Sequence, residues 1–560
     1  MKANNRLLAA IAALLLGALT VSGCAEIPRA SGVHQGPDIG SQLSSDYLYY
    51  SPSGPAAGES KADILAGFLN ASTGPQNDYE VAREYLAPSF KANWSPNDKV
   101  YIQAGGQTTT FSKTGEATVK LGVSATVDAL GTYSRAASGT KVSLGFHMVQ
   151  IDGQWRISWA PNALVMIRPV FDVIFHSYPI YFLDNGGRFL VPDLRWFPAR
   201  ASTATRLVSA TLSGPSTWLQ PAVRIPMPQG TRLAIQSVTL DKTTAQVNLN
   251  SVALKASKSQ MQQFKALLEA TLKQLPDITA VQIEVNGTKQ DIGEFIPSST
   301  DSGAFAPVVL RSNQLQQLIG PSGSALSAAA NWVSSLQAFD FGVSSDETAV
   351  ALESPTGTFA ADLRHPLVQP TLVDSRKSLL PPRYDRRVQL WLVGADGAVH
   401  IVEQNGKGSW SQLPWATGRT VVAFTVSPDG ARLATSVRDK DGTTRIYLAA
   451  VIRSSTGLVT GFGQPIEVQG VIGSPVSLQW AGQTNLMVLS TLTGNSYNLS
   501  VVSIGGDPRE VANVFNASNV MSSDDGANIY VLDKSGTVSQ YRGYTWTALA
   551  TQVDAAHMEN

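Results

Sequence analysis

The chain has 560 residues, of which 43% are hydrophobic and 15% are charged, and 42 basic residues balance 42 acidic ones. This length predicts roughly three to four domains of about 150 residues each, and the composition is that of ordinary globular domains. A net charge of zero supports neither the basic surface of a nucleic-acid-binding protein nor a polybasic membrane surface, so no nucleic-acid partner is expected.

Residues 1–23 have the three parts of an export signal. Lys2 and Arg6 are basic, residues 7–19 form an unbroken apolar run, and Val21-Ser22-Gly23-Cys24 follows it. A helix that crosses about 30 Å of hydrocarbon needs about 20 apolar residues, so this run is too short for a permanent anchor. The pattern therefore predicts a signal peptide that is cleaved.

Cys24 is the only cysteine, so no internal disulfide is possible. The tetrapeptide Val21-Ser22-Gly23-Cys24 resembles the lipobox of bacterial lipoproteins, whose thiol is acylated before the signal is cut off. The resemblance implies that Cys24 becomes the first residue of the mature protein, holds it to membrane lipid through acyl chains such as palmitate, and places it on the extracytoplasmic face of the cell membrane. The alternative is a buried, unmodified thiol that packs as a small hydrophobe.

Residues 24–58 are rich in Ser, Gly and Pro and show neither the helical nor the strand period. They are predicted to be a flexible tether. A chain of some 35 such residues spans on average roughly 30 to 35 Å, which sets the distance of the first domain from the lipid.

Residues 60–161 are predicted to form an α+β domain. Ser60 can cap a helix whose apolar residues share one face, and a second helix is predicted over 79–86. An alternation of period two then predicts three strands, over 117–127, 141–151 and 154–159. This order, with the run Arg83-Glu84-Tyr85-Leu86-Ala87-Pro88, resembles the NTF2-like fold, a cone that often holds a pocket.

His147 is the only histidine in the strands of this first domain. Some cones are enzymes that use Asp and His inside their pocket, and His147 is the only candidate for such a role. The favoured interpretation is a histidine on a strand face without a catalytic partner.

Residues 162–198 are predicted to be a packed aromatic connector with a hairpin turn at Asn185-Gly186. Residues 199–296 are predicted to be a second α+β domain, with a helix over 203–213, strands over 232–240, 244–250 and 281–285, and a helix capped by Ser257 or Ser259. The second domain resembles the GerMN domain, and the residues that carry the match are Leu212-Ser213-Gly214-Pro215, Ile225-Pro226 with Gly230-Thr231-Arg232-Leu233, Ala245-Gln246-Val247-Asn248-Leu249 and Gln274-Leu275-Pro276-Asp277-Ile278. That family is a non-catalytic interaction module, so the resemblance implies no active-site residue.

Residues 305–553 contain short strands and a repeated turn. The turn at Val426-Ser427-Pro428-Asp429-Gly430 is similar to the segments that begin at Val343 and Met521. Two further copies of this turn are Ala395-Asp396-Gly397 and Trp480-Ala481-Gly482. The period of about 40 to 50 residues predicts a β-propeller of five blades, with a sixth completed by residues 541–553. The turn aspartates could hold calcium, but aspartates in such turns more often cap their own backbone, so no metal site is predicted.

No catalytic motif is present in the sequence. It has no His-Glu-x-x-His, paired-cysteine, Gly-x-Ser-x-Gly, P-loop or Gly-x-Gly-x-x-Gly pattern, and its six histidines have no ligand spacing. No catalytic residue, metal or cofactor is predicted, although a Ser-His-Asp triad assembled across domains stays open. Trp410 and Trp415 could stack on sugar rings, but tryptophans in propellers more often lie in blade cores.

The order of lipobox, cone, GerMN-like domain and propeller resembles the LpqB family of actinobacterial lipoproteins. The resemblance implies a monomeric, membrane-anchored, non-catalytic accessory partner of a two-component sensor kinase, which contacts the extracytoplasmic domain of that kinase and influences envelope and cell-division signalling. The residues that bind this partner are unknown. The alternatives are a scaffold that binds cell-wall glycan, which needs exposed aromatic side chains, and an envelope hydrolase, which needs a buried acid, base or nucleophile in a pocket.

Overall fold

The computed structural model describes residues 52–300, 306–319, 324–326, 329–523 and 526–558. The predicted signal peptide and most of the predicted tether lie outside the described residues. No helix in the described part of the chain is long and apolar enough to span a membrane.

The last residues of the predicted tether, 52–58, are packed against the first domain. The Tyr85 hydroxyl donates a hydrogen bond to the Ser53 carbonyl at 2.9 Å, and the Gly58 N–H donates to Gln154 Oε1 at 2.8 Å. The prediction of a flexible tether is therefore wrong for these residues. Its composition gave no sign of the two contacts, because both partners lie far away in the sequence.

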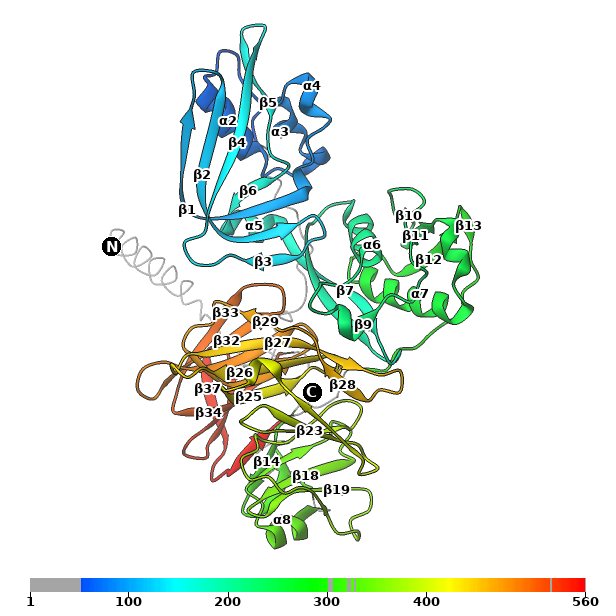
Figure 1. Ribbon diagram of the computed structural model, residues 1–560, viewed down its shortest axis with the longest axis vertical. Coiled ribbons are helices and arrows are strands. Elements are labelled where there is room, and N and C mark those ends of the chain that lie inside the picture. The colour runs from blue at the N-terminus through cyan, green and yellow to red at the C-terminus, as the bar shows by residue number, and fades with distance from the viewer. Residues whose placement is uncertain (1–51, 301–305, 320–323, 327–328, 524–525, 559–560) are drawn as a thin grey trace, which may run out of the picture. The chain divides into compact units, whose positions relative to one another are not determined.

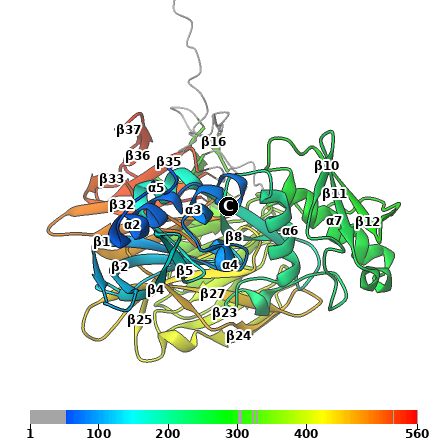
Figure 2. The same cartoon turned by 90° about the horizontal axis from the view of Figure 1, so that it is seen from above.

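The first domain has short helices beside a six-stranded sheet of order β5-β4-β2-β1-β6, with β3 added at β2 (Figure 1). Figure 2 shows α2 next to this sheet. The helices are α2 (Lys61–Ala71), α3 (Glu80–Glu84), α4 (Pro88–Lys91) and α5 (Arg168–Ile174). The strands are β1 (Lys99–Phe111), β2 (Glu116–Asp128), β3 (Tyr133–Arg135), β4 (Lys141–Ile151), β5 (Gln154–Trp159) and β6 (Leu164–Ile167).

Local signals account for most of these elements. Ser60 and Asp63 form a capping box at the start of α2, and every second side chain of β2 is buried in the core. The first domain's longest unpredicted strand is β1, whose second half is exposed and so lacks the alternation that identifies a strand. The predicted helix over 79–86 is shorter than expected, because Tyr79 has a left-handed backbone, with φ of 62°.

The predicted connector over 162–198 is packed, but its parts belong to two sheets. β6 pairs in parallel with β1 and so completes the sheet of the first domain. The hairpin of β7 (Phe175–Asp184) and β8 (Leu190–Pro198) instead pairs with β9 (Val223–Arg224) of the second domain. This segment is therefore not a separate unit between domains.

The second domain packs two helices, α6 (Thr203–Ser213) and α7 (Lys258–Leu272), against strands. Its own sheet has the order β10-β11-β12-β13, and the bounds are β10 (Thr239–Asp241), β11 (Thr244–Leu249), β12 (Ala280–Val285) and β13 (Thr288–Lys289). Ser257 and Gln260 form the capping box of α7. The prediction of a strand over 232–240 is wrong for most of its length, since only its last two residues belong to a strand that pairs with β11, and Leu233 forms an isolated bridge with Leu249.

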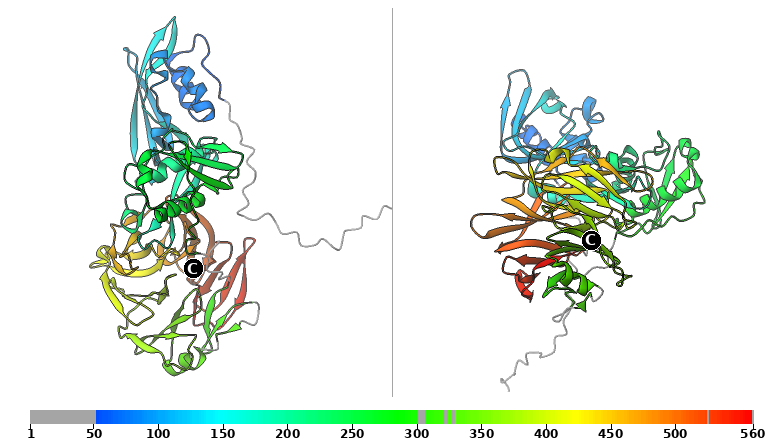
Figure 3. Two further views of the ribbon diagram at one scale, coloured as in Figure 1. Left: turned by 90° about the vertical axis from the view of Figure 1, so that its right-hand side faces the viewer. Right: turned by 60° about the horizontal axis from the view of Figure 1, so that its bottom comes forward.

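The third domain is a β-propeller, and in the described part of the chain it has six sheets (Figure 3). The helix α8 (Ala330–Leu336) lies in the chain between the first and second of these sheets. The strands of the first three sheets are β14 (Val308–Arg311), β15 (Gln314–Gln317), β16 (Ser324–Ala325), β17 (Asp340–Val343), β18 (Ala349–Ser354), β19 (Gly357–Asp362), β20 (Thr371–Asp374), β21 (Arg383–Tyr384), β22 (Leu390–Val393), β23 (Ala398–Val402) and β24 (Gly408–Gln412).

The other three sheets and the closing strand follow in chain order. They contain β25 (Thr420–Val426), β26 (Arg432–Arg438), β27 (Thr444–Arg453), β28 (Val459–Phe462), β29 (Ile466–Val468), β30 (Ser474–Ala481), β31 (Asn485–Thr491), β32 (Ser496–Ser503), β33 (Pro508–Phe515), β34 (Ala517–Ser522), β35 (Ile529–Asp533), β36 (Val538–Arg542), β37 (Thr545–Ala550) and β38 (Ala555–His557).

The sheet of β14, β15 and β16 is the one that the C-terminal end of the chain completes, but the strand that does so is not the predicted one. β37, within the predicted closing segment 541–553, is the last strand of the preceding sheet. The C-terminal strand β38 pairs with β14 and so joins the two ends of the propeller. β38 has only three residues, too few to show a strand period in the sequence.

One predicted turn repeat is also out of phase. Ala395-Asp396-Gly397 lies between β22 and β23, whereas the similar segments at Val343, Val426 and Met521 lie at the end of the first strand of their sheets. In the sheet of β21 the equivalent turn begins at Asp385. It has no Ser-x-Asp-Gly pattern, and it forms the contact described next.

Candidate functional site

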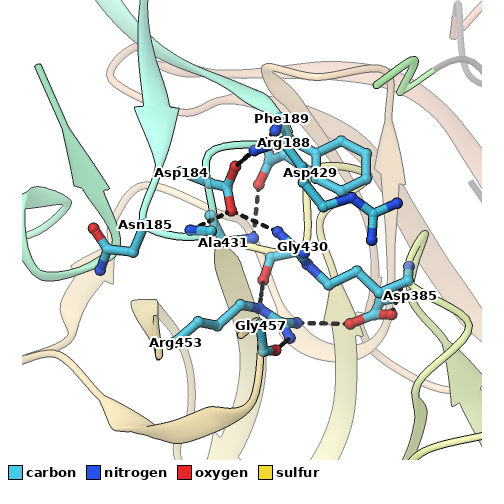
Figure 4. Close-up of polar contacts among 12 residues, drawn as sticks. Asp184, Asn185, Arg188, Phe189, Asp385, Asp429, Gly430, Ala431, Arg453 and Gly457 are labelled. Carbon is cyan, nitrogen blue, oxygen red and sulfur yellow. Dashed lines mark hydrogen bonds and ion pairs between the residues drawn. The ribbon is translucent and has the colours of Figure 1, made fainter. Parts of the chain in front are cut away.

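The turn of the β7–β8 hairpin is built around the buried carboxylate of Asp184 (Figure 4). This carboxylate accepts hydrogen bonds from the backbone N–H groups of Gly186, Arg188 and Phe189 at 2.9, 2.7 and 2.6 Å. Its Oδ2 also forms an ion pair with Arg387 Nη2 of the propeller at 2.5 Å, and the two side chains are only 2% and 6% exposed. Because a buried charge is costly without a partner, this pair holds the second domain on the propeller.

A second carboxylate positions Arg387 from the propeller side. Asp385 accepts the backbone N–H groups of Arg387 and Gln389 at 2.9 and 3.0 Å, and its Oδ2 pairs with Arg453 Nη2 at 2.6 Å. Arg453 Nε in turn donates to the Gly430 carbonyl at 2.9 Å. Burial, followed by the neighbouring Arg453 charge, lowers the pKa of Arg387 from its usual value.

A third carboxylate, Asp507, joins the first domain to the propeller. It pairs with Arg135 at 2.8 Å and also with Arg168. Arg168 Nη1 donates to the Tyr133 hydroxyl at 3.3 Å. Burial, and next the negative charge of Asp507, raise the pKa of Tyr133 well above its usual value, so the phenol stays neutral.

Strand β8 contacts both neighbouring domains. Arg195 forms a buried ion pair with Asp193 at 2.7 Å and donates to Thr132 Oγ1 of the first domain at 2.6 Å. Trp196 Nε1 donates to the Gly505 carbonyl of the propeller at 2.7 Å. The hairpin therefore lies at the centre of the contacts among the three domains.

A cavity of about 280 Å³ lies where the three domains meet. Its walls include residues 132–135 of the first domain, residues 192–194 of the second domain, and residues 466–469 and 502–506 of the propeller. Ligand sites are often found at domain interfaces, where concave surfaces bring apolar and polar groups together. This junction cavity is the candidate binding site of the protein.

The predicted lipid-attachment site is not described by the structure. Cys24 and the lipobox residues Val21, Ser22 and Gly23 lie outside the described residues. Acylation of Cys24 therefore stays a prediction from the sequence.

His147 lies on the surface of the first domain. Its side chain is on the exposed face of β4, and its ring makes an edge contact with Trp159 at 5.5 Å between ring centroids. The opposite face of the sheet packs on the helices. This position fits the interpretation of a histidine on a strand face rather than that of a catalytic residue.

The two tryptophans that were candidates for sugar stacking have different surroundings. Trp415 is buried in a blade core, and its Nε1 donates to Thr435 Oγ1 at 2.9 Å. Trp410 is 61% exposed and stacks on His400 with a centroid distance of 4.1 Å and an angle of 4°. Only Trp410 can meet a ligand.

The aspartates of the propeller turns cap their own backbone. Asp429 accepts from the Ser427 hydroxyl at 2.6 Å and from the Ala431 N–H at 2.9 Å, and Asp346 is bonded in the same way to Ser344 and Thr348. No group of three or more potential metal-ligating side chains was found in the part of the chain that the structure describes.

Two Asp–His pairs were not found from the sequence. His400 Nδ1 lies 3.1 Å from Asp374 Oδ2, and His557 Nε2 lies 2.5 Å from Asp340 Oδ1. Burial lowers the pKa of His557, and burial followed by the Asp340 charge raises the pKa of the nearby Glu353 to about 7. The partners are 26 and 217 residues apart, so no local spacing could have identified them.

Comparison with known families agrees with this architecture. The model described as "Lipoprotein LpqB, N-terminal domain" matches residues 54–172, "Sporulation and spore germination" matches 179–291, and "Lipoprotein LpqB beta-propeller domain" matches 316–557. Fold and matches together define a class of proteins with two α+β domains ahead of a propeller. The chain belongs to the LpqB lipoprotein family.

Similar curated proteins carry the name "Lipoprotein LpqB". The one from Thermobifida fusca is 26% identical over 73% of this chain and 65% of its own length, so the match covers just under two thirds of that protein. Those from Bifidobacterium longum and Streptomyces avermitilis are 23% and 25% identical, over 88% and 95% of this chain and 87% and 94% of their own lengths.

Two solved structures are similar to parts of the chain. The tandem GerMN domains of the sporulation protein GerM from Bacillus subtilis are 23% identical over 22% of this chain and 45% of that one, with a TM-score of 0.19. The Cps50 (Swd1) β-propeller domain of Myceliophteria thermophila is 9% identical over 38% of this chain and 72% of that one, with a TM-score of 0.28. Scores this low add nothing to the family assignment.

Proposed function

We propose that this protein is a lipid-anchored, non-catalytic accessory partner of a two-component sensor kinase. It binds the extracytoplasmic domain of the kinase and influences envelope and cell-division signalling. The observation that carries the proposal is the three-domain junction, because buried ion pairs such as Asp184–Arg387 hold the domains as one shaped binding surface. No cofactor has a role in it.

The anchor is the lipid on Cys24. The family name of the curated relatives, "Lipoprotein LpqB", supports this part of the proposal. Several acyl chains give stable attachment, since each buried methylene contributes about 0.8 kcal/mol.

Replacing the lipidated thiol tests the anchor. Cys24→Ala should abolish lipid labelling and release the protein from the membrane fraction, whereas Ser41→Ala, in the same predicted tether, should change neither. Undiminished membrane attachment of Cys24→Ala would refute the lipoprotein assignment.

Attachment to the membrane also makes weak partner binding effective. Two proteins held on one membrane meet at an effective concentration on the order of millimolar, so an interface that is weak in solution can be occupied in the cell. A monomer is sufficient for this role.

Crosslinking in intact cells tests the partner. The protein should be captured with a sensor kinase, and the captured kinase should also bind the purified chain through its extracytoplasmic domain. Recovery of glycan fragments alone, or turnover of peptidoglycan by the purified chain, would refute the proposal.

The exposed Trp410 favours glycan binding as a second candidate function. His400 supports the ring from one side, and Arg376 lies 4.7 Å from its centroid, so the indole is held in place while most of it faces water. Trp410→Ala should then reduce retention on purified peptidoglycan at least about five-fold. Tyr544→Ala removes another exposed aromatic side chain and should have no effect.

A further inference from the structure

The junction cavity is lined by three strands that each have one edge without a neighbouring strand, although β8 is bonded at that edge to Gly131 through the Trp196 N–H. In the described part of the chain, β3 pairs only with β2, β8 only with β7, and β29 only with β27. β3 belongs to the first domain, β8 to the second and β29 to the propeller. A strand edge carries backbone N–H and C=O groups that can pair with another strand.

The main chain of β3 shows which of its groups face outward. The Ala136 N–H donates to the Ser124 carbonyl at 2.8 Å, so the main-chain groups of Ala136 point toward β2. Hydrogen-bonding directions alternate along an antiparallel strand. The main-chain groups of Tyr133 and Arg135 therefore point away from β2, at the edge that lines the cavity.

The same alternation applies to β29. The Gly463 N–H donates to the Ala450 carbonyl at 2.9 Å, on the side of β27 that also faces β29. Leu448, two residues before Ala450, faces the same side and is paired with Ile466. The main-chain groups of Glu467, next to Ile466, consequently point away from β27.

Strand β8 contributes the third edge. The Trp196 N–H donates to the Gly131 carbonyl at 2.8 Å, away from β7. Leu194 lies two residues earlier, so its main-chain groups also point away from β7. Leu194 lines the cavity together with the outward-facing residues of β3 and β29.

The lining pattern agrees with these directions. Residues 132–135 and 466–469 line the cavity without a gap. Successive side chains of a strand point to opposite faces, so an uninterrupted run indicates that the strand presents its backbone to the cavity.

We propose that the junction cavity binds an extended peptide segment of a partner protein, which pairs through its backbone with the edges of β3, β8 and β29. This is recognition by strand addition. It deepens the proposed binding function but does not depend on the partner being a kinase. The volume of about 280 Å³ accommodates about two extended residues, at a rise of about 3.3 Å per residue and spacings of about 4.8 and 10 Å.

The side chains around the cavity favour a peptide with small apolar residues. Arg135 is paired with Asp507, and Glu467 lies 3.8 Å from Arg445, so these charges already have partners. Leu194 and Val502 add apolar walls. Specificity for a charged peptide is therefore not expected.

Two variants of one residue separate backbone from side-chain recognition. Glu467→Pro removes the outward N–H of β29, at an edge position where proline is tolerated, whereas Glu467→Ala removes only the side chain. Random decapeptides displayed in a library are selected on the immobilised full chain, and the selected peptides are titrated. Glu467→Ala should bind within about two-fold of the unmodified protein, and Glu467→Pro should bind at least about ten-fold more weakly.

Amide hydrogen exchange gives a second measurement on the unmodified protein, which holds even if Glu467→Pro does not fold. A selected peptide should slow exchange at Tyr133, Leu194 and Glu467. Equal binding by Glu467→Pro together with unchanged exchange would overturn the proposal, as would a library that yields no binding peptide. Peptides that bind only after removal of residues 25–51 would also overturn it, since the chain itself would then be the occupant.

A separate binding measurement with the extracytoplasmic domain of the sensor kinase distinguishes the two proposals. Binding of this domain without slowed exchange at the cavity would overturn strand addition and leave the kinase partnership intact. Slowed exchange with a selected peptide, but no binding of the kinase domain, would support strand addition and refute the kinase as partner.

Discussion

The propeller is held by two contacts that differ in burial. At the hairpin, the side chains of Asp184 and Arg387 are 2% and 6% exposed. Backbone N–H groups donate hydrogen bonds to the Asp184 carboxylate in place of water. At the first domain, Asp507 is 22% exposed, and its partners Arg135 and Arg168 are 39% and 34% exposed. Both contacts are Asp–Arg ion pairs, but only the hairpin contact is removed from water.

This difference separates two roles of an ion pair. Breaking a buried pair leaves a charge without water or partner, so that pair fixes how the second domain lies on the propeller. A pair that is partly open to solvent is weakened by water and salt ions, so the contact at Asp507 should contribute less to stability than the buried pair.

The largest expected effect is that of breaking the hairpin contact. Arg387→Ala should lower the free energy of unfolding by about 3 to 5 kcal/mol, because Asp184 stays buried without its cation. The measurement is urea denaturation followed by tryptophan fluorescence. As a control, Arg364→Ala breaks the pair between Arg364 and Asp362, whose side chains are 56% and 36% exposed, and should leave the free energy of unfolding nearly unchanged. Equal losses for the two variants would contradict the comparison.

Glu353 is a buried carboxyl that, unlike Asp184 and Asp507, has no cation bonded to it among the described residues. The pKa of Glu353 is about 7 when folded against 4.5 in the unfolded chain, so the folded state retains a proton that the unfolded state releases. Stability should therefore fall as pH rises from about 4.5 to about 7, and level off above that, by on the order of 2 kcal/mol. Glu353→Gln should flatten this part of the pH profile of urea denaturation. An unchanged slope in the variant would assign the pH dependence to another group.

The smallest effect is expected at the half-buried contact between Asp507 and the first domain. Asp507→Asn should lower the free energy of unfolding by at most about 1 kcal/mol, and the difference should shrink in 0.5 M salt. A loss as large as that of Arg387→Ala, or one that salt does not reduce, would show that burial does not explain the difference between the two contacts.

Local patterns in the sequence predicted many of the elements. The helix over 203–213 coincides with α6, and the strands over 141–151 and 154–159 coincide with β4 and β5. In each case the signal is local, either an apolar period or a turn such as Asp152-Gly153. The turn after β21 was not predicted, because it lacks the local pattern of the other turns. Its Asp385 caps the turn without the Ser-x-Asp-Gly pattern, and its Arg387 serves the hairpin instead.

The candidate site itself could not be predicted. Asp184 and Arg387 are 203 residues apart, and Arg135 and Asp507 are 372 apart. The cavity depends on strand edges from three domains, none of which has a signature of its own. Even β38, which closes the propeller, is too short to show one.

The sequence by itself predicted the export signal with Cys24, and it determined the order of the domains and most of their helices and strands, because these depend on neighbouring residues and on periods of two or 3.6 residues. Only the tertiary structure decided which charges meet, that Trp410 is exposed while Trp415 is buried, and where the unpaired edges of β3, β8 and β29 come together. Those features depend on packing between residues that are hundreds of positions apart, and no local pattern encodes them.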